Sequence, residues 1–400
     1  MSENIYLGGA KVVIFNTTSY PEMHGGSEFS CLELASELLK NDVNVCMLAL
    51  NDPSKGVEIF EYCGVRIKKI PLWNIFWPFS AKKRNLLMKV FWNLIDLLNI
   101  PMAIRVVRLV KSEGGDILHT NNIKGVSPWI FCACRLLGVR VIHTTRDFYL
   151  LDRQSWYRGD HNRMGLVARM ELTYKRWLSR PLKSVVFNSK YMLNAHANFA
   201  FFEKANRRVI YNGFAVNSVN EGIRQRESRV AGYIGRFSKE KGIDVLIDSF
   251  YRGKRGTKLI IAGGFRDDFL EIYPEMESKV KDLMPWIDFV GYMKSSDFYD
   301  MVDCIVVPSS YNEPFGRVAM EAIIRGLPVV VSNKGGLPEQ IKSSRFGVVC
   351  NDGEFYSCVR MIFDEYSNYG DVNNDDILEF SISYSAKSYM RAYSDLLSAG

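Results

Sequence analysis

The sequence predicts an α/β protein made of two doubly wound domains in tandem. Its 400 residues exceed what one hydrophobic core usually serves, which favours two domains. Short apolar runs alternate with helical patterns along the chain, and this alternation is typical of parallel sheets covered on both faces. The alternation restarts after Asn212-Gly213, so we place the domains at residues 1–214 and 215–375.

The predicted strands of the N-terminal domain are short and apolar, and helices connect several of them. The strands are Lys11–Asn16, Val43–Leu50, Asp116–His119, Val139–Thr144 and Ser184–Asn188. The helices are Ser27–Lys40, Ser127–Leu137 and Met164–Leu178. Gly138 is well placed to end the second helix, because glycine readily adopts the left-handed conformation found there.

A second series follows the polar segment Ala215–Arg229, which we interpret as a linker. Its strands are Val230–Gly235, Lys258–Gly263, Ile287–Tyr292, Asp303–Val307 and Leu327–Ser332, and its helices are Ile243–Tyr251 and Ser296–Val302. Ligands bind at the carboxyl ends of the strands in doubly wound sheets. The motifs below lie at such ends, so we expect them to face a cleft between the two domains.

Composition narrows the class of protein. A hydrophobic content of 47% and a charged content of 24% are ordinary for a soluble globular enzyme. Scattered cysteines and the lack of a signal-peptide pattern favour the cytoplasm. The five histidines have no short metal-binding spacing, so we expect no metal site. The net charge of +7 is not accompanied by a nucleic-acid-binding motif, so we expect no nucleic-acid partner.

Two carboxylates, Glu313 and Glu321, stand on either side of a Pro-Phe-Gly turn between a predicted strand and a predicted helix. Pro314 fits the first turn of that helix, where its missing N–H costs nothing. Gly316 allows the backbone to come close to a ligand. Because a helix N-terminus attracts anions, an anion site flanked by two carboxylates suits a nucleotide sugar.

Arg236 and Lys241 follow the strand Val230–Gly235. A sugar that leaves a nucleotide diphosphate leaves new negative charge behind, and fixed cations stabilise such charge as it develops. Two surface cations at a loop are the alternative. The sequence Gly25-Gly26-Ser27 opens the first helix, where glycines and a helix N-terminus again favour an anion, unless they form a plain tight turn.

The segment Asn312–Glu321 resembles the E-x7-E signature of the retaining glycosyltransferases of family 4, which have the GT-B fold. Other segments resemble further motifs of that family and occur in the family's order. They are His24–Glu28, Asn212-Gly213, Gly235–Gly242 and Gly335–Glu339. The resemblance implies two Rossmann-like domains that face each other across a cleft, with the last helix, within residues 376–400, packed back on the N-terminal domain.

The resemblance also implies roles for individual residues. The catalytic residues would be Arg236, Lys241 and Glu313, and the donor-binding residues would be Gly26, Tyr292, Phe315, Gly316 and Glu321. Glu313 would hydrogen-bond the donor sugar and Glu321 the ribose. Alternatively, Glu321 could merely pair with Arg317 one turn earlier, and Tyr292 could close a strand edge instead of lying beside the nucleobase.

The sequence departs from the family pattern at two places on the acceptor side. Asn121 stands where the family often has the second histidine of an H-x-H motif, and Arg146-Asp147 replaces a later H-D dipeptide. Asn121 can hydrogen-bond a hydroxyl but cannot act as an acid or a base. Asn121, Arg146 and Asp147 are therefore acceptor-side candidates, whereas we expect His119 and His143 to be structural.

The activity that the resemblance implies is metal-independent transfer of a hexose-type sugar, with retention, from a UDP- or GDP-sugar to a hydroxyl acceptor. Assembly of bacterial surface polysaccharide, whether O-antigen (lipopolysaccharide), capsule or exopolysaccharide, is the expected setting. Substituting Arg236 or Lys241 should lower turnover roughly 100-fold and change folding little. A nucleotide-sugar 2-epimerase and a non-catalytic, nucleotide-sugar-binding regulatory partner remain the alternatives.

The region Trp73–Val110 combines large aromatic residues with the basic run Lys82-Lys83-Arg84. Aromatic residues with cationic neighbours suit a membrane interface. If the acceptor is a lipid-linked glycan, this region would hold the enzyme peripherally on the anionic cytoplasmic face of the inner membrane. An ordinary helix pair packed on the sheet is the alternative.

Overall fold

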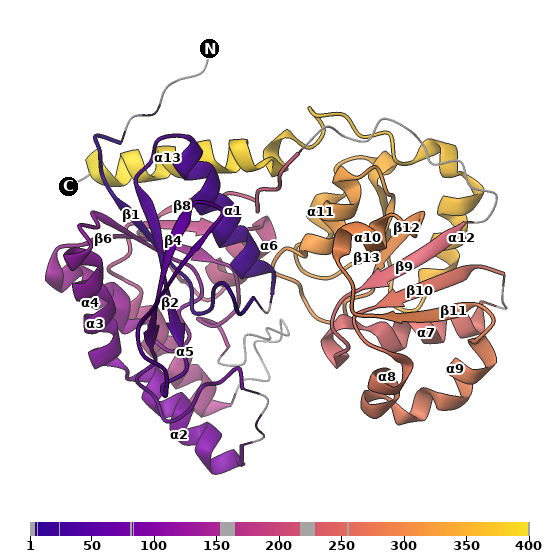
Figure 1. Ribbon diagram of the computed structural model, residues 1–400, viewed down its shortest axis with the longest axis horizontal. Coiled ribbons are helices and arrows are strands. Elements are labelled where there is room, and N and C mark those ends of the chain that lie inside the picture. Colours follow the sequence, from indigo (N-terminus) through magenta and orange to yellow (C-terminus); the bar gives the residue numbers. More distant parts are fainter. Residues whose placement is uncertain are drawn as a thin grey trace. The chain divides into compact units, whose positions relative to one another are not determined.

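The protein folds into two compact α/β units, shown as a computed structural model in Figure 1. Residues 5, 7–23, 25–80, 82, 84–152, 165–216, 229–253 and 256–398 are described. One unit comprises Met1–Ala215 with Glu379–Gly400, and the other comprises Val216–Leu378. His24, Lys83, Met164 and most of the expected linker lie outside the described residues.

The first unit contains a sheet in which every neighbouring pair is parallel except β3 and β4. In spatial order its strands are β3 (Glu58–Tyr62), β4 (Val65–Pro71), β2 (Val45–Asn51), β1 (Val12–Phe15), β5 (Ile117–Thr120), β6 (Arg140–Thr145), β7 (Ser184–Phe187) and β8 (Asn206–Val209). The predicted apolar strands are present within two residues at each end. Strands β3, β4 and β8 were not predicted, because charged and exposed residues interrupt their apolar pattern.

Helices cover both faces of this sheet. They are α1 (Gly26–Lys40), α2 (Leu86–Leu97), α3 (Ile100–Ser112), α4 (Trp129–Leu137), α5 (Leu166–Leu178), α6 (Lys190–Ala197) and α13 (Ile382–Ser398). Alternate residues of β1 point to opposite faces, so Val12 and Ile14 pack with α1 and α13 whereas Val13 and Phe15 pack with α3 and α4. In Figure 1 the yellow helix α13 lies alongside α1 in this unit.

The second unit has a fully parallel sheet. In spatial order its strands are β11 (Ile287–Gly291), β10 (Lys258–Ala262), β9 (Val230–Ile234), β12 (Cys304–Val307), β13 (Val329–Ser332) and β14 (Gly347–Cys350). Its helices are α7 (Ile243–Arg252), α8 (Arg266–Ile272), α9 (Glu277–Leu283), α10 (Ser295–Tyr299), α11 (Arg317–Ile324) and α12 (Phe355–Asp364). Strand β14 and helices α8, α9 and α12 were not predicted.

Strand order reverses once in each unit, between β1 and β5 and between β9 and β12. Neighbouring loops diverge at such a point, which leaves room for a ligand at the carboxyl ends of the strands. Gly26 and Asn121 lie beyond β1 and β5, and Lys241 and Glu313 lie beyond β9 and β12. The topology alone therefore brings each pair of motifs to the edge at which doubly wound sheets commonly bind ligands.

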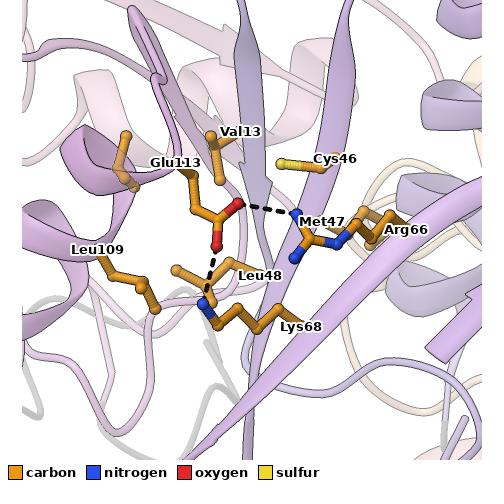
Figure 2. A pocket seen from close by; sticks show the side chains of 9 residues that line it. Val13, Cys46, Met47, Leu48, Arg66, Lys68, Leu109 and Glu113 are labelled. Carbon is orange, nitrogen blue, oxygen red and sulfur yellow. Dashed lines mark hydrogen bonds and ion pairs between the residues drawn. The ribbon is translucent and has the colours of Figure 1, made fainter. Parts of the chain in front are cut away.

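Near the amino ends of the strands of the first sheet, two ion pairs join the end of α3 to β4 (Figure 2). Glu113, just after α3, accepts hydrogen bonds from Arg66 (2.9 Å) and Lys68 (2.7 Å) of β4. Hydrogen bonding from Lys68 is the largest effect lowering the pKa of the Glu113 carboxyl. The cavity beside these residues is only about 10 Å³, room for one water molecule at most, so it is no sugar site.

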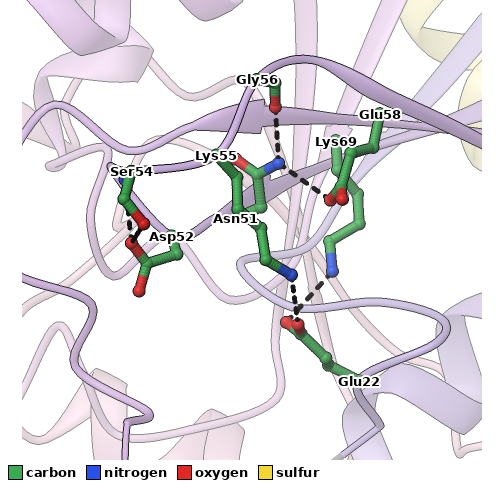
Figure 3. A network of polar contacts seen from close by, with 8 residues as sticks. All are labelled: Glu22, Asn51, Asp52, Ser54, Lys55, Gly56, Glu58 and Lys69. Carbon is green, nitrogen blue, oxygen red and sulfur yellow. Dashed lines mark hydrogen bonds and ion pairs between the residues drawn. The ribbon is translucent and has the colours of Figure 1, made fainter.

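A second network ties down the loop between β1 and α1 (Figure 3). Glu22 accepts hydrogen bonds from Lys55 and from the buried Lys69, each at 3.1 Å. Burial raises the pKa of Glu22, but the two lysines outweigh it and the net shift is downward. The loop that leads to Gly25-Gly26 is thus held by charge as well as by backbone hydrogen bonds.

Helix α13 is joined to the first sheet by a buried chain of hydrogen bonds. Tyr393 bonds His119 Nδ1 (2.8 Å), His119 Nε2 bonds Thr144 (2.7 Å), and Thr144 bonds Tyr389 (3.1 Å). A Cβ on Gly213 would lie 2.7 Å from Ile382, so only glycine lets α13 begin so close to this segment.

Candidate functional site

The centre of the candidate site is an ion pair between Lys241 and Glu313 in the second unit. Lys241 Nζ lies 2.7 Å from Glu313 Oε1, and 7% of the Glu313 side chain is exposed. Ser309 also donates to Oε1, and the Tyr311 hydroxyl donates to Oε2, both at 2.8 Å. The structure thus brings together two of the predicted catalytic residues, which are 72 positions apart in the sequence.

The environment of Glu313 keeps its carboxylate ionised. Burial is the largest single influence and would raise its pKa, but the charge and hydrogen bond of Lys241 and the two hydroxyl donors outweigh it, so the pKa is lowered. A carboxylate offers about four acceptor positions. Three donors among the described residues leave room for one more, such as a hydroxyl of a ligand.

Glycines lock the two loops that carry this pair. Gly335 has φ +63°, and a Cβ there would lie 2.1 Å from the Glu313 carbonyl oxygen, to which the Gly336 N–H donates (2.8 Å). Gly242 has φ +65°, and a Cβ there would lie 2.0 Å from the carbonyl oxygen of Pro308. The glycines at both places are therefore required by close backbone packing as well as by backbone conformation.

The Pro-Phe-Gly turn differs from the prediction at its start. Helix α11 begins at Arg317 with Gly316 as its N-cap at φ +88°, so Pro314 precedes the helix and the prediction that it lies in the first turn is wrong. The turn is fixed by Gln340, whose amide Nε2 donates to the carbonyls of Phe315 (2.5 Å) and Gly316 (3.0 Å). The Phe315 ring is buried, which leaves the backbone as its means of contact with a ligand.

Glu321 makes the contact that the sequence offered as an alternative. Arg317 Nε donates to its Oε1 over one helical turn (3.1 Å), and the Tyr299 hydroxyl donates to its Oε2 (3.1 Å). Burial raises the pKa of Tyr299, and the negative charge of Glu321 raises it further. The pairing orients Glu321 on α11 and leaves about a fifth of its side chain exposed.

Arg236 is exposed in the loop after β9. Burial and Glu313 raise the pKa of the Tyr311 hydroxyl, and Arg236 lies near enough for its charge to oppose that rise. Tyr292 lies elsewhere. It follows the edge strand β11, two strands from β9, and is 76% exposed.

On the first unit, the two departures from the family pattern form one hydrogen-bonded group. Arg146 Nε donates to Asn121 Oδ1 (2.7 Å), and its Nη1 donates to Asn212 Oδ1. All three residues are buried, and Asn121 Nδ2 also donates to the Phe15 carbonyl (3.2 Å). Asn121 therefore orients the guanidinium that stands in place of the family histidine.

Asp147 and Gly26 occupy the same edge of the first sheet. Burial raises the pKa of the Asp147 carboxyl, although the Tyr149 N–H donates to it (3.0 Å) and opposes the rise. Gly26 is the exposed first residue of α1, and its N-cap, Gly25, has no side chain to cap the helix.

His119 and His143 lie in the core. His143 Nδ1 bonds the Thr120 hydroxyl at 2.9 Å, and burial lowers its pKa to about 3. Burial also lowers the pKa of His119, and both of its ring nitrogens are hydrogen-bonded, one to Tyr393 and the other to Thr144. Both rings are fully hydrogen-bonded or buried against aromatic residues, in keeping with a structural role.

Several residues around the site were not singled out from the sequence. Ser309, Tyr311 and Gln340 belong to ordinary-looking loop segments, and their contacts with Glu313 and the Pro-Phe-Gly turn arise from folding. Their closeness in sequence to Glu313 or to the Gly335–Glu339 segment is the feature that could have identified them as site residues. Among the described residues, no group of three or more His, Cys, Asp or Glu side chains is placed to hold a metal ion.

Family comparisons cover both units. A model described as Glycosyltransferase Family 4 matches residues 24–217, and one described as Glycosyl transferases group 1 matches residues 218–361. A Klebsiella pneumoniae protein, described as an uncharacterized 42.6 kDa protein in the cps region, is 32% identical over 332 residues, which are 82% of this chain and 86% of that protein. An uncharacterized glycosyltransferase of Methanocaldococcus jannaschii is 37% identical over 352 residues, 82% of each chain.

Solved structures share the fold at low sequence identity. Sucrose-phosphate synthase from Thermosynechococcus elongatus superposes with a TM-score of 0.74 at 19% identity, over 98% of this chain and 100% of that chain. Anabaena HepE in complex with UDP superposes with a TM-score of 0.69 at 16% identity, over 96% and 100%. Both family models and relatives that match most of the chain lead to one conclusion: this chain belongs to the group 1, family 4 glycosyltransferases and has the GT-B fold.

Proposed function

We propose that this glycosyltransferase moves a hexose-type sugar from a nucleotide-diphosphate sugar to a hydroxyl acceptor with retention of configuration and without a metal ion. The observation that carries the proposal is the Lys241–Glu313 pair at the point where strand order reverses between β9 and β12. A cation and an oriented carboxylate there match what a departing diphosphate and a sugar hydroxyl require.

The proposed reaction forms and breaks its bonds on one face of the sugar. The bond from sugar C1 to the diphosphate oxygen breaks, a bond from C1 to the acceptor oxygen forms on the same face, and the acceptor proton passes to the departing phosphate oxygen. Arg236 and Lys241 stabilise the charge that develops on the diphosphate. Glu313 accepts a hydrogen bond from the donor sugar, which positions C1 for attack.

The other predicted residues take supporting roles in this proposal. The N–H groups at Phe315-Gly316 and the start of α11 receive phosphate oxygens, and Glu321 binds the ribose. Asn121, Arg146 and Asp147 contact the acceptor side from the first unit. The exposed Tyr292, two strands away, would reach a nucleobase only if the nucleotide extends over β10.

A UDP-sugar is our first choice of donor, and assembly of surface polysaccharide on the cytoplasmic side is our choice of setting. HepE, which shares the fold, forms complexes with UDP and UDP-glucose. The Klebsiella relatives are described by their position in a cps region. These descriptions belong to the relatives and support the proposal for this chain.

The test measures nucleotide release from UDP-, GDP-, ADP- and dTDP-sugars, with and without acceptor glycans, by the parent protein and three variants. Lys241→Met and Glu313→Gln should each lose about 100-fold or more in turnover. Lys239→Met is the matched control, because it removes an exposed lysine from the same turn. Equal activity of Lys241→Met and Lys239→Met would remove the pair from the site.

The products separate the proposal from its alternatives. Retention predicts that the anomeric configuration of the donor sugar persists in the product, which proton NMR coupling constants report. A nucleotide-sugar 2-epimerase would instead convert the donor into its C2 epimer without an acceptor, and the nucleotide would stay attached to the sugar. A regulatory partner would bind nucleotide, seen as a rise in melting temperature, and release none.

A further inference from the structure

Helix α2 in the first unit exposes most of its apolar residues and buries only Trp92 and Asp96. Its inner side carries the buried Asp96, whose carboxylate accepts hydrogen bonds from the Gly125 N–H (2.5 Å) and the Tyr149 hydroxyl (2.6 Å). Its outer side is apolar and open. Between 36% and 76% of each outer residue is exposed, and these residues are Leu86, Leu87, Val90, Phe91, Leu94, Ile95 and, at the C-cap, Leu98.

This outer side, which we call the α2 face, is a continuous stripe. Its members recur at spacings of three and four, so they lie along one side of the helix. The stripe continues into a hollow of about 490 Å³ lined by Trp73, Leu94, Ile95, Leu98, Asn99 and Pro101. Scattered exposed apolar residues are normal on proteins, but a contiguous patch of this kind marks a binding surface.

The helix is held firmly in this orientation. Trp92 is buried and donates through its indole nitrogen to the Phe76 carbonyl (2.9 Å). Asn85 caps the first turn by accepting from the Met88 N–H (2.8 Å), and Asn99, just beyond the helix, donates to the Trp73 carbonyl (2.9 Å). The exposure of the α2 face is therefore part of the fold.

Charge identifies the partner of the α2 face. Residues 73–112 contain seven lysines and arginines and a single acidic residue, Asp96, which is buried; the net charge of +6 compares with +7 for the whole chain. Arg84 Cζ lies 5.0 Å from the centroid of the Phe76 ring, and Arg105 Cζ lies 4.4 Å from the centroid of the Trp73 ring, so both guanidinium groups stack on aromatic rings. Cations thus border the apolar stripe, as at the headgroup level of an anionic membrane.

We propose that the α2 face inserts into the headgroup region of an anionic phospholipid bilayer, so that the first unit lies on the membrane surface. A second copy of the chain is a poorer partner, because pairing two α2 faces would bring two segments of charge +6 together. Membrane binding itself does not depend on the proposed function. Only its biological reason, access to a lipid-linked acceptor, rests on that function.

The residues proposed to insert into the membrane differ from those that the sequence suggested. Two of the tryptophans of the region, Trp77 and Trp92, are buried in the core and cannot reach a membrane. In the proposal, the exposed leucines of α2 insert into the membrane instead of these tryptophans. No single described helix is long and apolar enough to cross a membrane. Helices α2 and α3 together are long and apolar enough, but they are bent by 49°, and α3 buries five apolar residues in the core.

The test compares binding to sedimented vesicles of equal parts phosphatidylglycerol and phosphatidylethanolamine. One variant combines Leu87→Gln, Phe91→Gln and Leu94→Gln, because glutamine preserves the helix and the replaced side chains are exposed. The matched control combines Leu136→Gln, Met361→Gln and Tyr384→Gln, which remove exposed apolar side chains from α4, α12 and α13.

We expect the parent and the control to bind and the α2 variant to bind at least roughly tenfold more weakly, because three apolar side chains leave the bilayer. Equal binding by the α2 variant and the control overturns the proposal. So does a parent dimer, seen by sedimentation velocity, that only the α2 variant dissociates. Nucleotide release with a soluble acceptor should be the same in all three proteins. If it is absent from all three while vesicle binding follows the expected order, the proposed function fails and the α2 face stands.

Discussion

Replacing Lys241 by methionine separates the proposed catalytic role of the lysine from its structural one. Methionine keeps an unbranched apolar stem and removes the charge that lies 2.7 Å from Glu313 Oε1. Turnover should fall about 100-fold or more, since the proposed reaction develops charge where this fixed cation is lost. The sequence alone predicted little change in folding, but the ion pair adds a cost in stability.

The size of that cost follows from burial. Removing one partner of a fully buried ion pair costs about 3–5 kcal/mol, because the other charge stays buried without compensation. Glu313 is 7% exposed, but Lys241 is 28% exposed, so water already screens part of the pair. Ser309 and Tyr311 would still donate to the carboxylate. We therefore expect a loss of about 2 kcal/mol in the free energy of unfolding.

The pH dependence tests this reasoning most sharply. In the parent, the lowered pKa of Glu313 means that the carboxylate contributes stability above its unfolded value of 4.5 and loses it as the pH falls. Without Lys241, burial becomes dominant and raises the pKa, so the remaining contribution is present at low pH and lost as the pH rises. The stability difference between parent and variant should therefore be large at about pH 8 and shrink towards about pH 4.5.

Urea unfolding followed by tryptophan fluorescence measures both quantities. Adding Glu313→Gln to Lys241→Met should recover part of the lost stability, because a neutral amide replaces the unpaired charge, and should recover no activity. A stability loss that is the same at both pH values, or no larger than that of Lys239→Met, would refute the assignment of Lys241 as the counter-ion of Glu313.

Three further predictions follow from the structure. Burial lowers the pKa of His143 to about 3 and that of His196 to about 4, so the contribution of each ring to stability is present above the unfolded pKa of 6.5 and is lost as the pH falls. Thermal melts should show that the free energy of unfolding falls by about 1 kcal/mol per pH unit for each ring below that pH. A flat stability profile from pH 7.5 to about 5 would contradict this. Gly335→Ala should abolish activity and destabilise far more than Gly138→Ala. Both glycines have positive φ, but the new Cβ at Gly335 would lie 2.1 Å from the Glu313 carbonyl oxygen, whereas nothing lies within 4 Å of a Cβ at Gly138; equal unfolding midpoints would contradict the packing argument. Turnover should survive EDTA, and a strict requirement for Mg²⁺ or Mn²⁺ in the washed enzyme would remove the metal-independent mechanism.

Much of the fold was predictable because buried parallel strands are short apolar runs. Strands β1, β2, β5, β6 and β7 and the core strands of the second unit were found in that way. The β3–β4 hairpin was missed because β3 is an exposed edge strand, which needs no apolar run, and because charged residues interrupt the apolar residues of β4. Pro314 misled the placement of α11, since a left-handed Gly316 and not the proline starts that helix.

The sequence by itself determined which residues stand at the carboxyl ends of the strands, because order along the chain and the end of each strand suffice for that. It identified Lys241 and Glu313 separately, together with Asn121 and Arg146 as two unrelated departures. Only the tertiary structure showed that the members of each pair are in contact. Lys241 and Glu313 are 72 positions apart and Asn121 and Arg146 are 25 positions apart, so their contacts depend on the order of the strands in each sheet. The direction of the α2 face was likewise decided by packing, because Asp96 and Trp92 found buried partners and thereby turned the leucines towards solvent.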